Sequence, residues 1–233
     1  MNKIFILALM CVAFQKSDSL NRGSDIFRSP IVIDRSYSKR IKINCTEAQI
    51  INYKALYIGK YTDTIRLVDG VKNPDHRRLQ LTHFGTYSAL IIKVDTSQLI
   101  TGKNIEYFNN GNDKREIFYE AYPVFLYNTQ GDTVYMGSGM VLPLRMEALD
   151  IENNWRFIEQ YRMYYCGTGL PKFYLPDNGI ILTSAPKYTG EFKTKLRLRY
   201  KEIVSNEFYG SINLKQFDIE ADSVRLKRFG NEY

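Results

Sequence analysis

Five cationic side chains occupy every second position between residues 193 and 201. Side chains of an extended strand alternate between its two faces, so these five would form one row with neighbours about 6.6 Å apart. Such a row can bind the phosphate, sulfate or uronate groups of an anionic ligand. It is the first candidate ligand-binding site of the chain, and its members are Lys193, Lys195, Arg197, Arg199 and Lys201.

Two interpretations of this row need no ligand. Runs of charge are usually solvated, and neighbouring strands can supply acidic partners such as Glu191, Glu202 or Glu207. A Lys-rich edge strand also resists pairing with other chains. In each case the alternation predicts a strand whose other face is buried, formed by Phe192, Thr194, Leu196, Leu198 and Tyr200.

A second candidate surface lies between Asp150 and Cys166, a segment crowded with aromatic residues. Helical and extended periodicities both fit part of it, and Glu159 breaks the extended pattern. The density of Trp, Phe and Tyr favours a strand. Exposed rings can bind sugars or protein partners, although such rings more commonly fill a core. The candidate ligand-binding rings are Trp155, Tyr161 and Tyr164.

Three cysteines are present, and Cys11 lies in an apolar run at the amino terminus. If that run is removed as a leader, Cys45 and Cys166 remain. In an oxidising compartment the pair would be a candidate disulfide. The alternative is two separate buried thiols, because a free cysteine packs like a small apolar residue.

The sequence contains no recognisable catalytic or metal-binding motif. His76 and His83 are seven residues apart, without cysteines or acidic residues at zinc-ligand spacing. Two Gly-x-Gly segments, 137–139 and 167–169, are followed by β-type sequence rather than by a helix, so they predict turns and not phosphate-binding loops. We therefore expect no catalytic residue, no metal site and no cofactor.

Residues 1–19 have the features of a secretory signal peptide: Lys3, an apolar run over Ile4–Phe14 and a polar exit. The run is too short to span a bilayer, which needs about 20 apolar residues. A buried amino-terminal strand would have the same composition. The first interpretation predicts export to the periplasm, the cell surface or the extracellular space, with a lipid-anchored form left open.

Beyond residue 30 the chain alternates between apolar and polar residues and is punctuated by turn-forming clusters. This pattern predicts an all-β fold, an antiparallel β-sandwich of immunoglobulin-like architecture with one or two β lobes. The chain lacks the Cys…Trp…Cys order of immunoglobulin domains. Predicted strands include Ala55–Lys60, Thr64–Val68, Arg78–Leu81, Tyr87–Asp95, Ile105–Phe108, Glu116–Tyr127, Thr133–Gly137, Met140–Ala148, Lys172–Leu175 and Ile180–Ser184.

The predicted organisation is a signal peptide over 1–19, an amino-terminal β region over 20–100, a β-sandwich over 101–217 and a carboxy-terminal strand or tail over 218–233. One continuous domain is the alternative to this division. The predicted function is an exported, non-enzymatic binding or structural module of the cell envelope. The net charge of +7 suits an anionic glycan, lipid phosphate or envelope protein as partner, and nucleic acid is not the expected one. The rival functions are an envelope glycan hydrolase and an anion-binding module that uses the 193–201 row.

Overall fold

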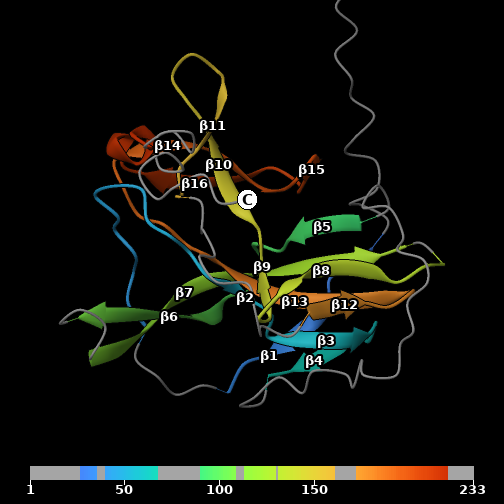
Figure 1. The fold of residues 1–233 in the computed structure, drawn as a ribbon. Coiled ribbons are helices and arrows are strands. Elements are labelled where there is room, and N and C mark those ends of the chain that lie inside the picture. Colours follow the sequence, from blue (N-terminus) through green and yellow to red (C-terminus); the bar gives the residue numbers. More distant parts are fainter. Residues whose placement is uncertain are drawn as a thin grey trace, which may run out of the picture.

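The computed structural model describes residues 27–35, 40–67, 90–108, 113–129, 131–160 and 172–219. Within these ranges the elements are strands and one 3-10 turn, η5 (Leu214–Phe217), which confirms the all-β prediction (Figure 1). The strand pairs are antiparallel except for β1 (Ile31–Ile33) and β4 (Thr64–Arg66), which pair in parallel.

The central sheet is built around β13 (Gly179–Pro186), which pairs with β3 (Tyr57–Lys60) on one side and β7 (Asp113–Asn128) on the other. The other edge of β7 pairs with β5 (Leu90–Val94) and then with β6 (Ile100–Phe108). All eight residues of β13 are buried. A strand covered on both faces is expected to be almost continuously apolar, as Ile180–Leu182 is.

Two further sheets lie against the central sheet. The first has the order β12 (Lys172–Leu175), β8 (Val134–Ser138), β9 (Val141–Leu142) and β2 (Tyr53–Lys54). In the second, here called the β14 sheet, β14 (Phe192–Tyr200) pairs with β10 (Arg145–Leu149) on one edge and with β15 (Ile203–Val204) and β16 (Phe208–Ile212) on the other. β11 (Trp155–Phe157) extends it beyond β10.

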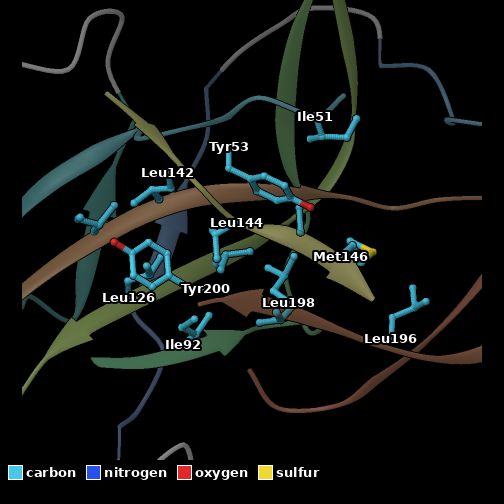
Figure 2. Packing of buried hydrophobic residues seen from close by; sticks show 14 of the residues in the cluster. Ile51, Tyr53, Ile92, Leu126, Leu142, Leu144, Met146, Leu196, Leu198 and Tyr200 are labelled. Atoms are coloured by element: carbon cyan, nitrogen blue, oxygen red, sulfur yellow. The ribbon is translucent and has the colours of Figure 1, made fainter. Parts of the chain in front are cut away.

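Apolar side chains from all three sheets form one core. Figure 2 shows Ile92 and Leu126 of the central sheet near Leu142, Leu198 and Tyr200 of the other two and near Leu144, which lies between β9 and β10. A second, smaller core covers the opposite face of the central sheet and contains Ile65, Ile100, Phe125, Ile180 and Leu182. The central sheet therefore separates two apolar layers.

The predicted strand Met140–Ala148 is two strands in the structure. Of the predicted apolar face, Leu142, Leu144 and Met146 are buried, whereas Met140 is half-buried and lies in the turn before β9. Pro143 stands exposed between β9 and β10, where the chain leaves one sheet and enters another. Because proline cannot donate a ladder hydrogen bond, it suits this interruption.

The turn predicted at 137–139 is present at its second glycine, while Gly137 and Ser138 still belong to β8, and the segment 167–169 lies outside the described residues. Gly139 and Met140 join β8 to β9 with φ values of 65° and 63°, as a two-residue hairpin turn requires. At residues 176–179 the Gly179 amide donates to the Pro176 carbonyl. That second turn joins strands of two different sheets, β12 and β13, rather than a hairpin pair.

Strands from either side of residue 100 share the same sheets. β2 pairs with β9, β3 with β13 and β5 with β7. The division near residue 100 and its alternative, one continuous domain, both stay predictions. The predicted strand Arg78–Leu81, the leader at 1–19 and most of the tail at 218–233 lie outside the described residues.

Candidate functional site

The outer face of the β14 sheet carries the cationic row. Leu196, Leu198 and Tyr200 are buried on the inner face, as predicted, so Lys193, Lys195, Arg197 and Arg199 lie on the outer one. Strand β14 ends at Tyr200, and Lys201 follows in a turn with a φ of 53°. Its carbonyl oxygen accepts a hydrogen bond from Arg199.

Strand β10 adds a carboxylate and a further cation to the same face. Glu147 lies opposite Arg197, and Arg145 lies opposite Arg199. Arg197 Nε donates to Glu147 Oε2 at 2.6 Å, and Arg199 Nε donates to Glu147 Oε1 at 2.7 Å. The Glu147 side chain is only 6% exposed. One buried carboxylate thus fixes two guanidinium groups side by side.

Strand β11 supplies aromatic rings that cover two of the guanidinium groups. The Arg197 guanidinium carbon lies 4.1 Å from the ring centroid of Trp155, and that of Arg145 lies 3.7 Å from the ring centroid of Phe157. Both rings are half-buried. Cation–π contacts of this kind are attractive, so the two arginines are held in one orientation.

Strand β16 completes the face on the other side of β14. Lys195 lies opposite Tyr209, and its ammonium group contacts the Glu207 carboxylate at 2.9 Å. Both members of this ion pair are well exposed, at 42% and 37%. Lys193 is exposed and lies opposite Ser211. We call this surface the cationic face: Arg145, Lys193, Lys195, Arg197 and Arg199, with the carboxylates of Glu147 and Glu207.

The candidate sites predicted from sequence have different outcomes. Acidic partners on neighbouring strands are present, with Glu207 among those expected and Glu147 not foreseen. Trp155 lies on the outer face beside Arg197, while Tyr161 and Tyr164 lie outside the described residues. Cys45 is buried and Cys166 lies outside the described residues, so their disulfide stays a prediction. His76 and His83 lie outside those ranges as well.

A second polar cluster, which sequence reasoning missed, is centred on Glu159 inside the protein. Its carboxylate accepts hydrogen bonds from the hydroxyl groups of Tyr53 and Tyr188 at 2.7–2.9 Å and from the Met146 amide at 2.8 Å. The residue is 1% exposed. The donors come from β2, β10 and the segment after β13, so this one side chain connects two sheets with the chain that leaves the central sheet.

Burial governs the ionisation of this cluster. It raises the pKa of Glu159 to about 7, although the donors from Tyr188, Met146 and Tyr53 and the charge of Arg145 act to lower it. The pKa of each tyrosine is raised well above its usual value, first by burial and then by the Glu159 charge. Nearby, burial raises the pKa of the Cys45 thiol to about 12, with a further contribution from Glu159.

The only sequence signal of this cluster was the interruption at Glu159 in the aromatic pattern. Alternation places Trp155 and Phe157 on one face, yet Ile158 and Glu159 are both buried in succession. The chain has left β11 at this point and forms an isolated parallel bridge with Gln49. A residue that contradicts its local pattern was therefore the sign of a buried polar site.

A cavity of about 530 Å³ lies near η5, and its lining includes neither Glu159 nor the carboxylates of the cationic face. Its polar lining includes Asn44, Thr46, Glu191, Asn213 and Lys215. The Asn213 amide already donates to Asn44 Oδ1 at 2.6 Å and to the Cys45 carbonyl at 2.8 Å. These contacts connect η5 to the chain around Cys45, which is a structural role.

Among the described residues, no three His, Cys, Asp or Glu side chains gather closely enough to ligate a metal ion. Nor does the described part of the chain contain a helix of the length and hydropathy that crossing a bilayer demands. Comparisons of the chain with models of protein families, with curated proteins and with solved structures found no match.

Proposed function

We propose that this protein is an exported, non-enzymatic β-sandwich binding module of the cell envelope, and that the cationic face is where it binds an anionic polymer. The observation that carries the proposal is the charge on that face, whose described residues include five cations and two carboxylates. Three of the cations are arginines that neighbouring groups hold in place. A positive surface that is already ordered loses little side-chain entropy when it binds an anion.

Paired cations and acids are also what a solvated sheet face would show. The distinction lies in the net charge of the face. Among its described residues, the carboxylates of Glu147 and Glu207 are fewer than the lysine and arginine side chains around them, so the net charge of this surface is positive. Such an excess attracts polyanions, and salt weakens the attraction.

The hydrolase alternative has less support from the geometry. A glycosidase needs two carboxyl groups that flank a bound sugar. Among the described residues the two most buried glutamates are Glu147 and Glu159, and the oxygens of both already accept hydrogen bonds within the protein. The cavity near η5 has Glu191 as the acid in its lining, with Lys215 beside it.

The test is binding of dextran sulfate to the purified protein over a series of salt concentrations. We expect Lys193→Ser together with Lys195→Ser to lower the affinity by about tenfold at low salt, with the difference shrinking as salt rises. The matched control replaces two exposed lysines elsewhere, Lys54→Ser with Lys60→Ser, and should change the affinity less than twofold. Equal affinity of the Lys193/Lys195 variant and the control would refute the proposal.

A further inference from the structure

Tyr209 stands out among the aromatic residues of the cationic face because its ring is open to solvent. The residue is 77% exposed, on the outer side of β16. Trp155 and Phe157, the other two rings of the face, each have an arginine stacked on them. Tyr209 is therefore the ring best placed to contact a ligand.

Two lysines flank this ring. Lys195 lies directly opposite Tyr209 in the register, and Lys193 lies opposite Ser211, the next outward position of β16. Opposite side chains on paired strands have Cβ atoms about 4.5–5.5 Å apart, so a small ligand on the ring can reach both ammonium groups. Lys195 pairs with Glu207 in a contact that is open to solvent, and such pairs are weak, so an incoming anion can displace the Glu207 carboxylate.

We propose that Tyr209, Lys193 and Lys195 form a subsite for one acidic sugar residue, a uronate or a sulfated hexose, of a polysaccharide bound along the cationic face. The proposal rests on the function proposed above and adds the class of ligand to it. The C–H face of the sugar stacks on the phenol ring, and its carboxylate or sulfate binds the two ammonium groups. The Ser211 side chain, on the same outward row, offers a hydroxyl group to the hydroxyls of the sugar.

The combination of groups distinguishes this ligand from other polyanions. Inorganic polyphosphate has no apolar face, so it could use the lysines but would gain nothing from the ring. Single-stranded nucleic acid is usually bound by several rings that stack successive bases. Arginines stack on the rings of Trp155 and Phe157, so Tyr209 is the one open ring among the described residues of this face, which favours a single sugar contact.

The experiment compares four polymers: polygalacturonate, which carries only carboxylates, dextran sulfate, which carries only sulfates, inorganic polyphosphate and oligo(dT). Each is titrated against the full protein and its Tyr209→Ala and Tyr209→Phe variants. We expect Tyr209→Ala to weaken binding of at least one of the two polysaccharides by about tenfold and binding of polyphosphate by less than twofold. Tyr209→Phe keeps the ring and should bind within about threefold of the original protein. The polysaccharide that responds identifies the acidic group.

The outcomes separate this inference from the proposed function. If Tyr209→Ala leaves both polysaccharides unaffected while Lys193→Ser with Lys195→Ser weakens them, the sugar subsite is refuted and the anion-binding face stands. An equal loss for polyphosphate, or a larger loss for oligo(dT) than for either polysaccharide, also overturns the subsite. If the lysine variant changes no affinity, the proposed function itself fails. Because Tyr209 is exposed, an unchanged melting temperature of each variant confirms that the fold is intact.

Discussion

Glu147 and Glu159 are both almost inaccessible to solvent, at 4% and 1% exposure, yet their surroundings stabilise them in different ways. Glu147 lies on the outer face of the β14 sheet, where two arginines bind its oxygens. Glu159 lies where three sheets meet, and the donors to its carboxylate are two tyrosine hydroxyls and a backbone amide. One carboxylate is balanced by charge and the other by neutral hydrogen-bond donors.

The comparison shows how the two groups respond to their surroundings. Neutral donors reduce the cost of burying a carboxylate but do not remove it, so the pKa of Glu159 rises to about 7. The nearest cation, Arg145, donates to the Glu159 backbone carbonyl at 3.1–3.3 Å and stacks on Phe157. Arg145 thus belongs to both environments, as a cation of the outer face that lowers the pKa of the inner carboxyl.

The most severe test of the comparison is Glu159→Leu. This change leaves two buried hydroxyl groups and a buried amide without their acceptor, at about 1–3 kcal/mol each. We expect the free energy of unfolding, measured by urea denaturation, to fall by about 5 kcal/mol. Tyr53→Phe and Tyr188→Phe added to Glu159→Leu should restore much of the loss, because the unpaired hydroxyls are then absent. If Glu159→Leu alone is as stable as the original protein, the carboxylate does not hold the sheets together.

The pH dependence of stability should separate the two glutamates. The folded-state pKa of Glu159 is raised from 4.5 to about 7, so between these values the folded protein binds more protons than the unfolded chain. The contribution of Glu159 to stability is therefore complete below pH 4.5 and is lost as pH rises to 7, by about 3 kcal/mol. Ionisable groups that interact with Glu159 are Tyr53, Tyr119, Tyr188, Cys45 and Arg145.

Glu159→Gln isolates this contribution, because the amide cannot ionise. Subtracting the unfolding free energy of the variant from that of the original protein at each pH removes the contribution of every other group. Asp95, whose pKa is lowered, contributes with the opposite sign at lower pH and cancels in the difference. A difference that stays flat between pH 4.5 and 7 would show that Glu159 ionises normally.

The smallest of the three effects is expected at the outer face. Glu147→Ala removes the shared acceptor of Arg197 and Arg199, whose side chains are 16% and 29% exposed. Because water can reach both guanidinium groups, we expect a loss of about 2 kcal/mol in urea denaturation, below the 3–5 kcal/mol typical of a fully buried pair. Glu207→Ala, which breaks the exposed pair with Lys195, serves as the control and should lower the free energy of unfolding far less than Glu147→Ala does. Equal losses of unfolding free energy in the two variants would mean that Glu147 contributes no more to stability than an exposed acidic residue.

The sequence predicted the outer face better than the inner cluster, and the reason is periodicity. Strand β14 has one buried and one solvated face, so alternation alone assigned Leu196 and Arg197 to opposite sides. The bounds of β12 were also predicted, because Pro176–Gly179 marks its end. Alternation cannot say which strand lies alongside, so Glu147 as the partner of Arg197 and Arg199 was not foreseen.

Glu159 could not be assigned a role because its partners come from distant parts of the chain. Tyr53 and Tyr188 approach it only through the packing of three sheets, and neither has a local motif. The solvent exposure of Tyr209 could not be predicted either, since its position on the outer face depends on pairing with β14. The local pattern therefore predicted which face of a strand is buried. The contacts that form each candidate site depend on how distant strands pair and pack.

The position of β13 at the centre of the fold affects the order in which the chain can assemble. Its two neighbours, β3 and β7, come far earlier in the sequence, and neither pairs with the other. Until residues 179–186 insert between them, both strands lack a hydrogen-bonded partner on that side. The strand that lies between the two apolar layers is then missing. Contacts so distant in sequence slow folding, because the long intervening loops must close first. A nascent chain that ends before Gly179 would thus be unable to form either hydrophobic core in full, even if its earlier strands had already formed.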